Sequence, residues 1–353
     1  MEKNINLKIL NIISGSNNGG AEAFFERFCI SINKERDIKQ KVIIRRNKKR
    51  YELLTSNGLD VKQFGFMGKW DFFTKFLINV TSEEFKPDII FSWMNRASYL
   101  IPNLKSSAVK VGRLGGYYKI KNYINCDYLI TNTDDIRKFV ISQGWDPNMV
   151  KRINNFVKIK NNSKKKIVAP INNKKYRIIL ALGRFHENKA FEILIEALLK
   201  LENHFLWLLG RGELKADYIK LAEKIGVEKR IKIIDWSENI SEYYNKADVL
   251  VCPSRVEPLG NIIIEGWCHK IPVVASNIMG PKKLIKHKVN GMKFELENID
   301  ELVKCLKELD SNNVLKRKMI NNAYKDYQNH FSEEKVINDF KKFFWEIKNK
   351  CAE

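Results

Sequence analysis

Two glutamates, Glu257 and Glu265, lie eight positions apart and flank a Gly-Asn step at Gly260 and Asn261. An apolar run at 249–252 predicts a strand before them, and the segment between them predicts the start of a helix. Amides at a helix N-terminus are unpaired and carry partial positive charge, so such a place suits a phosphate. The loop carboxylate could accept hydrogen bonds from sugar hydroxyls, and the helical one could bind a ribose. A capped helix start in any α/β protein would explain the same local pattern.

A second loop, Gly183–Ala190, lies between a predicted strand and a predicted helix. Arg184 and Lys189 bracket its turn. Two cations at a helix N-terminus suit a diphosphate, with arginine acting as a fork and lysine as a point charge. The alternative is an exposed basic turn in a very basic protein.

A third loop, Gly15–Glu22, has Gly19 and Gly20 directly before a predicted helix. Glycines let the backbone approach a phosphate closely. The loop does not have the G-x-G-x-x-G spacing, and no Lys-Ser/Thr pair follows it. Both the dinucleotide fingerprint and the P-loop are therefore excluded.

Composition sets the frame for these loops. The chain has 353 residues, which predicts about two domains, and 44% hydrophobic residues, enough for a sizeable core. Its formal charge of +22 favours phosphate-rich partners, although an AT-rich coding sequence would also give many lysines. No arginine-rich block alternates with aromatics, so we expect no nucleic-acid binding.

The six cysteines are scattered without a C-x-x-C pair or a metal-like cluster, which indicates reduced thiols in a cytoplasmic protein and no bound metal. The N-terminus predicts no signal peptide. No run of about 18 apolar residues exists, so we expect no membrane span.

Short apolar strands alternate with helices through both halves of the chain, a pattern typical of parallel βαβ units. We therefore predict an α/β fold with two Rossmann-like, doubly wound domains. The predicted divisions are a domain at 1–160, a polar linker at 161–175, a second domain at 176–330 and a C-terminal helix at 331–353 that crosses back to the first domain. Ligands of such sheets bind outside the carboxyl ends of the strands, where all three loops are expected.

The motifs together resemble a retaining glycosyltransferase of family four with the GT-B fold, in which the two domains face each other across a cleft. The family shows G-R-x-x-x-x-K, E-P-x-G-x-x-x-x-E and a G-x-P-V-V strand, which correspond here to 183–189, 257–265 and 270–274, with Lys270 in place of the glycine. The Gly19–Glu22 loop and the N-x-V segment at 155–157 also match. The resemblance covers nearly the whole chain.

The resemblance implies roles for individual residues. Arg184 and Lys189 would neutralise the leaving nucleotide diphosphate, and Glu257 would hold the donor-sugar hydroxyls. The remaining implied contacts are the backbone at Leu259, Gly260 and Asn261 to sugar and phosphate, Glu265 to the ribose, Trp236 beside the base or in the core, and Gly19 and Gly20 to the phosphate from the first domain.

One departure concerns the first domain, where many relatives have a histidine near the reacting carbon. This chain has five histidines and none before His186. The loops after the strands at 88–93 and 109–113 offer other side chains for catalysis or acceptor binding, namely Asn95, Arg96, Arg113 and Tyr117. Alternatively, Trp93 and Tyr117 belong to the core and the arginines pair with carboxylates on the rim.

The resemblance implies sugar transfer from a nucleotide sugar with retention of anomeric configuration and without a metal or other cofactor. UDP-sugars are favoured over GDP-sugars, and two-acid glycoside hydrolysis is disfavoured because no flanking carboxylate pair is evident. A bacterial-looking composition suggests a cell-envelope acceptor such as lipopolysaccharide or a lipid-linked oligosaccharide. The basic, aromatic segments 48–51 and 69–73 could lie on the anionic inner face of the cytoplasmic membrane, or could simply be solvated. The alternative is a non-catalytic or epimerase-like protein that binds sugar nucleotides.

Overall fold

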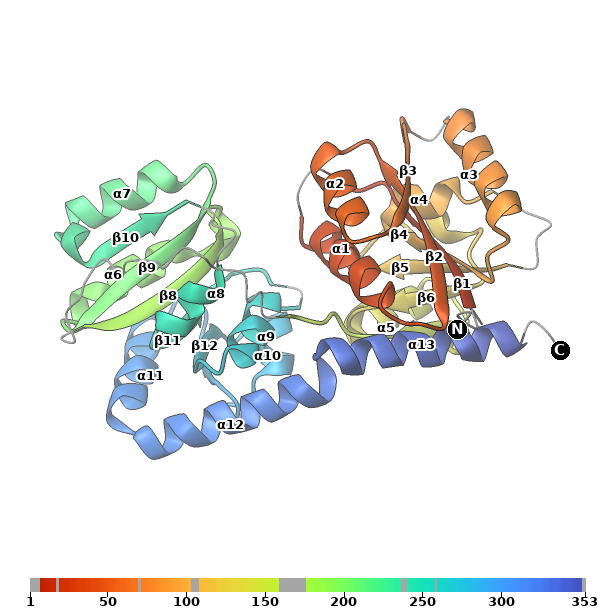
Figure 1. The fold of residues 1–353 in the computed structure, drawn as a ribbon. Coiled ribbons are helices and arrows are strands. Elements are labelled where there is room, and N and C mark those ends of the chain that lie inside the picture. The colour runs from red at the N-terminus through yellow and green to blue at the C-terminus, as the bar shows by residue number, and fades with distance from the viewer. Residues whose placement is uncertain are drawn as a thin grey trace. The chain divides into compact units, whose positions relative to one another are not determined.

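The computed structural model describes residues 7–16, 19–68, 71–102, 108–158, 176–235, 240–257 and 259–350. The chain divides into two compact units (Figure 1). The first unit contains residues 1–156 and 333–353, and the second contains residues 157–332. Each unit has its own parallel sheet.

The first unit is built on a seven-stranded sheet in the order β3-β2-β1-β4-β5-β6-β7. Its strands are β1 (Leu7–Ile13), β2 (Ile38–Arg45), β3 (Asp60–Phe64), β4 (Ile89–Trp93), β5 (Val109–Leu114), β6 (Tyr128–Thr131) and β7 (Val150–Arg152). The chain builds one side of the sheet from β1 and then returns to build the other side from β4. The strand order therefore reverses between β1 and β4, which pair in parallel from Ile9 opposite Ile89.

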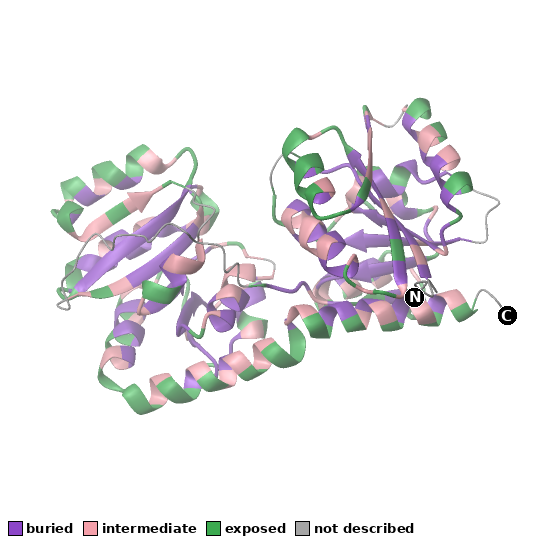
Figure 2. Ribbon diagram, in the orientation of Figure 1, coloured by how far each residue is buried: buried purple, intermediate pink, exposed green. Residues whose placement is uncertain are grey.

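Helices cover both faces of this sheet, as expected for parallel strands that are buried on two sides. All five residues of β4, a central strand, are buried, whereas the edge strand β3 is mostly half-buried (Figure 2). The helices of the unit are α1 (Gly20–Ile32), α2 (Lys48–Ser56), α3 (Phe72–Phe85), α4 (Met94–Leu100), α5 (Asp134–Ser142) and α13 (Glu333–Lys350).

The C-terminal helix α13 is part of the core of the first unit. Phe340 lies 4.8 Å from the ring of Phe28, and Phe344 lies 5.3 Å from Phe91. All three phenylalanines of α13, Phe340, Phe343 and Phe344, are buried. Lys341 pairs with Glu35 at 2.6 Å, so polar contacts also tie the helix to the loop after α1.

The second unit has a six-stranded sheet in the order β10-β9-β8-β11-β12-β13. Its strands are β8 (Arg177–Arg184), β9 (His204–Arg211), β10 (Ile231–Ile234), β11 (Val249–Cys252), β12 (Val273–Ser276) and β13 (Met292–Phe294). Its helices are α6 (Phe191–Ala197), α7 (Lys215–Lys224), α8 (Ile240–Lys246), α9 (Asn261–Cys268), α10 (Met279–Leu284), α11 (Ile299–Ser311) and α12 (Asn313–His330). Here the strand order reverses between β8 and β11.

The predicted α/β fold with a helical C-terminus is confirmed, and most predicted strands lie within two or three residues of their observed bounds. The strands β3, β7 and β13 were not predicted. Each is short and at or near a sheet edge; β7 and β13 have three residues, and two of the three in β7 are exposed, so no apolar run marks them. The predicted linker at 161–175 lies outside the described residues.

Membrane spans and thiols can be stated for the described part of the chain. No helix there is both long and apolar enough to cross a bilayer. The five cysteines in this part of the chain are buried and form no disulfide with one another.

Candidate active site

The site is organised by the point in the second unit where the strand order reverses. Strands β8 and β11 are neighbours there, with Ile179 opposite Val249. The loop after β8 carries Lys189, and the loop after β11 carries Glu257. Because the strands are parallel, both loops leave the same edge of the sheet, where ligands of doubly wound sheets bind.

Lys189 and Glu257 form an ion pair at this edge, although 68 positions separate them in the chain. The Lys189 Nζ atom lies 2.5 Å from Glu257 Oε2, and the two side chains are only 23% and 13% exposed. The other carboxylate oxygen accepts a hydrogen bond from the Gly260 amide at 3.2 Å. A cation, a carboxylate and a helix start therefore converge at one place.

The start of α9 requires a glycine at Gly260 and carries an unsatisfied side-chain oxygen on Asn261. Gly260 precedes the helix with φ +86°, a left-handed conformation that favours glycine. A Cβ atom at this position would also lie 3.0 Å from Ile263 Cδ1. The Oδ1 atom of Asn261 is buried and has no hydrogen-bond partner among the described residues. The helix start thus places an unsatisfied polar atom among the first amides of a helix, which as a rule have no partner within the helix.

Arg184, at the end of β8, pairs with a different carboxylate from the one that Lys189 contacts. Its side chain is 70% exposed, and its ionic partner is Glu213 at 3.9 Å. An exposed pair of this kind contributes little to stability, so the guanidinium can leave it at small cost to meet an anion. His186 lies 3.8 Å from the same glutamate.

Arg255 fixes the turn that carries Lys189, a role that the sequence reasoning missed. Its Nη1 donates to the carbonyl of Glu187 at 2.7 Å, and its backbone amide donates to the carbonyl of Asn188 at 2.8 Å. Its guanidinium also pairs with Glu192 and Glu297, each at 2.6 Å. The loop after β11 thereby holds the loop after β8 in place. Nothing in the local sequence distinguishes Arg255 from an exposed basic residue.

Glu265 lies in the second turn of α9, half-buried, and accepts a hydrogen bond from the hydroxyl of Tyr244 at 2.8 Å. Tyr244 is on α8 and is buried. Burial and the neighbouring Glu265 carboxylate raise the pKa of Tyr244 well above its usual value, so the phenol is a donor at neutral pH. Glu265 is therefore held on one side by protein.

Close backbone packing at the ends of β8 and β9 explains two glycines near the site. A Cβ atom on Gly210 would lie 1.8 Å from the carbonyl oxygen of Gly183. One on Gly212, whose φ is +157°, would lie 2.3 Å from the carbonyl of Phe185. The Gly-Arg-Gly sequence at the end of β9 indicates this close contact, although it was not among the predicted features.

Of two further predicted donor contacts, Leu259 lies within the described residues and Trp236 does not. Leu259 is half-buried and packs against the core under α9, so only its backbone is available to a ligand. Trp236 lies outside the described residues. Within the described part of the chain, no group of three or more His, Cys, Asp or Glu side chains could hold a metal ion.

In the first unit, a buried carboxylate explains the glycines of the loop after β1. Glu22 is 4% exposed and accepts hydrogen bonds from the backbone amide and the hydroxyl of Ser16, at 2.7 and 2.9 Å. A Cβ atom on Gly19 would lie 2.2 Å from Glu22 Oε2, whereas one on Gly20 would meet open space. Gly19 therefore makes room for Glu22, and Gly20 leaves the helix start open.

The predicted acceptor-side residues Asn95 and Arg96 lie in the first turn of α4, not on a loop as predicted, because the helix begins directly after β4. Asn95 is half-buried, and its Oδ1 has no hydrogen-bond partner among the described residues. Arg96 is exposed and donates to the carbonyl of Phe66 at 3.2 Å. Tyr117 is 49% exposed and packs its edge against Phe139 at 5.2 Å, so it is not a core residue.

Arg113 departs from its predicted place on an open acceptor surface, because the structure buries it. The side chain is 4% exposed, its guanidinium lies 4.8 Å from the Phe24 ring centre, and Nη2 donates to Asn155 Oδ1 at 2.6 Å. Trp93 and Phe340 complete the aromatic cage at 5.2 and 5.1 Å. Burial lowers the pKa of Arg113 to about 9, which leaves it charged at neutral pH. Its position fits a structural role.

The two parallel-sheet α/β units have the GT-B fold of the solved neighbours, and the family model and curated relatives show an enzyme of the glycosyltransferase class. The family model of glycosyl transferases group 1 matches residues 162–326 of the chain. It is 28% identical to the lipopolysaccharide core biosynthesis glycosyltransferase LpsE of Rhizobium meliloti, over 91% of this chain and 94% of that protein. It is 27% identical to LpsD of the same organism, over 96% and 98%.

The fold likeness extends to solved structures. The crystal structure of HepE from Anabaena in complex with UDP-glucose superposes with a TM-score of 0.79 and 19% identity, covering 96% of this chain and all of that chain. This likeness supports the GT-B architecture. The predicted glycosyltransferase class is confirmed, while family four and retention stay predictions.

Proposed function

We propose that this glycosyltransferase moves a sugar from a UDP-sugar to a glycan or glycolipid of the bacterial cell envelope, with retention of anomeric configuration. The observation that carries the proposal is the Lys189–Glu257 pair at the start of α9. It places a cation for a diphosphate beside a carboxylate for sugar hydroxyls. The names of LpsE and LpsD, and the UDP-glucose in HepE, support the choice of acceptor and donor.

In the proposed reaction, the bond between the sugar and the diphosphate breaks as the acceptor oxygen attacks on the same face. The acceptor proton passes to the leaving diphosphate. Lys189, the exposed Arg184 and the amides of α9 stabilise the charge that develops on the phosphate oxygens. Because these groups supply the positive charge, we propose that no metal is required. Glu265 binds the ribose of the nucleotide.

The experiment that tests this proposal is a donor screen followed by a transfer assay. We expect UDP-sugars to raise the melting temperature more than GDP-, ADP- or CMP-sugars, because a ligand that binds the folded state stabilises it by mass action. With envelope glycolipid as acceptor, the product should keep the donor's anomeric configuration by proton NMR, also in the presence of EDTA. An inverted product, or activity that EDTA abolishes, would contradict the mechanism.

We also propose that the first unit contacts an anionic membrane from the cytoplasmic side. The support is an exposed apolar surface at the start of α3, where Phe72, Phe73 and Phe76 are 70%, 70% and 60% exposed, next to Met67 at 88%. Of the segments singled out in the sequence, Arg50 is instead buried against Glu26, and residues 69 and 70 lie outside the described residues.

The triple variant Phe72→Ser, Phe73→Ser and Phe76→Ser is expected to lower binding to phosphatidylglycerol vesicles at least about tenfold, because each ring loses apolar burial. Vesicle binding of the triple variant and the wild type is measured by cosedimentation with these vesicles and with neutral phosphatidylcholine vesicles. The matched control is Ile124→Ser, another apolar residue of this unit that is 79% exposed. If the triple variant and the wild type bound the vesicles equally, the proposed membrane contact at the start of α3 would be wrong.

A further inference from the structure

Tyr244 and Glu265 form a contact that the reaction scheme above leaves unused. Glu265 and His269 lie four positions apart, at the middle and C-terminal end of α9, so they share one face of the helix. Tyr244 reaches both from α8. Its hydroxyl donates to Glu265 Oε2 at 2.8 Å, and its ring stacks on His269 with centres 4.6 Å apart and planes 7° from parallel.

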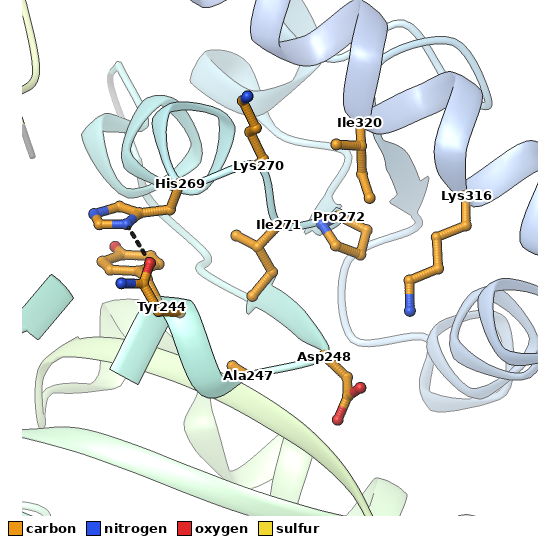
Figure 3. Close-up of a pocket in the computed structure, with 10 residues that line it drawn as sticks. Tyr244, Ala247, Asp248, His269, Lys270, Ile271, Pro272, Lys316 and Ile320 are labelled. Carbon is orange, nitrogen blue, oxygen red and sulfur yellow. Dashed lines mark hydrogen bonds between the residues drawn. The ribbon is translucent and has the colours of Figure 1, made fainter. Parts of the chain in front are cut away.

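Figure 3 shows this stack at the wall of a pocket that lies by the amino ends of β11 and β12. The Nδ1 atom of His269 is 3.1 Å from Asn245 Oδ1, so the imidazole is fixed in its plane. Tyr244 is 2% exposed. A phenol clamped on one face and fully buried can offer its hydroxyl in one direction only.

The charge states favour this arrangement at neutral pH. Burial raises the pKa of Tyr244, which keeps its proton for donation. Burial also lowers the pKa of His269 to about 4, so the stacked imidazole is neutral and does not compete for the carboxylate as a cation. One oxygen of Glu265 is thereby bound to the Tyr244 hydroxyl, which restrains the orientation of the carboxylate.

We propose that Tyr244 is a positioning residue that orients Glu265 to recognise the ribose hydroxyls of the donor nucleotide. The inference rests on the proposed function, in which Glu265 binds the ribose. A carboxylate that is already oriented loses less conformational freedom when it binds a diol. Without the phenol, Glu265 can turn away, and the enzyme should lose its preference for a ribonucleotide over a nucleotide without ribose hydroxyls.

The test compares UDP with 2′,3′-dideoxy-UDP by titration calorimetry. For the wild type we expect clearly tighter binding of UDP. Tyr244→Phe keeps the ring and removes only the hydroxyl, so we expect UDP binding to weaken about tenfold while dideoxy-UDP binding stays the same. In the double variant Tyr244→Phe with Glu265→Gln, the loss should not exceed that of Glu265→Gln alone, because both changes remove one function.

The matched control is Tyr243→Phe, the same substitution on the neighbouring position of α8, where the ring packs on Trp207 at 5.5 Å. It should leave the preference for UDP unchanged. Wild-type preference in Tyr244→Phe, or equal weakening of both nucleotides, would overturn the positioning role. If Glu265→Gln itself kept the wild-type preference, or the wild type bound neither nucleotide, the proposed donor contacts would fail and this inference with them.

Discussion

Lys189→Gln is expected to lower the rate of sugar transfer by roughly a hundredfold or more. A hydrogen bond to a charged group is worth about 1.5–3 kcal/mol, which alone corresponds to a factor of roughly 10–100. The substitution also removes the cation beside Glu257, which is only 13% exposed. The diphosphate would then approach an uncompensated carboxylate, and this repulsion adds to the loss. Steady-state kinetics with a UDP-sugar measures it.

A second variant separates the two contributions. Lys189→Gln combined with Glu257→Gln removes the repulsion, so it should bind UDP better than Lys189→Gln alone and remain inactive. The matched control is Lys288→Gln, which breaks a 2.6 Å pair with Glu308 elsewhere in the unit. If Lys189→Gln transferred sugar as fast as Lys288→Gln, the Lys189–Glu257 pair would have no part in the reaction.

Arg113→Ala is expected to lower the free energy of unfolding by about 2–4 kcal/mol. The change leaves a cavity among Phe24, Trp93 and Phe340 and deprives Asn155 of its donor. In a domain of this size, each kcal/mol shifts the melting temperature by about 2–4 °C. A decrease of roughly 5–15 °C by calorimetry is the expected result, with UDP affinity at low temperature unchanged.

Arg113→Met provides the companion measurement. Methionine fills most of the cage without a buried charge, and replacement of buried ionic groups by apolar ones can be neutral. It should therefore recover at least half of the stability that alanine loses. If both variants melted like the wild type but lost transfer to acceptor, Arg113 would be an acceptor residue and its structural role would be wrong.

The loops of the site could be predicted from the sequence because their chemistry follows apolar strands. Glu257 and Gly260 stand directly after such a strand, and Lys189 stands before a predicted helix. Their contact could not be predicted from the residues alone, because it depends on β8 and β11 being neighbours. That strand order is a property of the whole sheet.

For Arg113 and Tyr244, the local sequence does not indicate which distant residues will surround the side chain. The cage around Arg113 combines rings from α1, β4 and α13, which are far apart in the chain. An arginine at a strand end therefore has the same local pattern whether it is buried or exposed. Tyr244 lies in a short helix and acquires its role only from a carboxylate 21 positions later.

In the proposed donor complex, Lys189, Glu257 and the start of α9 hold the diphosphate and the sugar of the donor. The most direct measurement is a crystal structure of the protein with UDP-glucose bound. We predict phosphate oxygens within hydrogen-bonding distance of Lys189 Nζ and of amides at the start of α9, with the sugar hydroxyls at Glu257. A nucleotide that lay away from the loops after β8 and β11 would contradict the account.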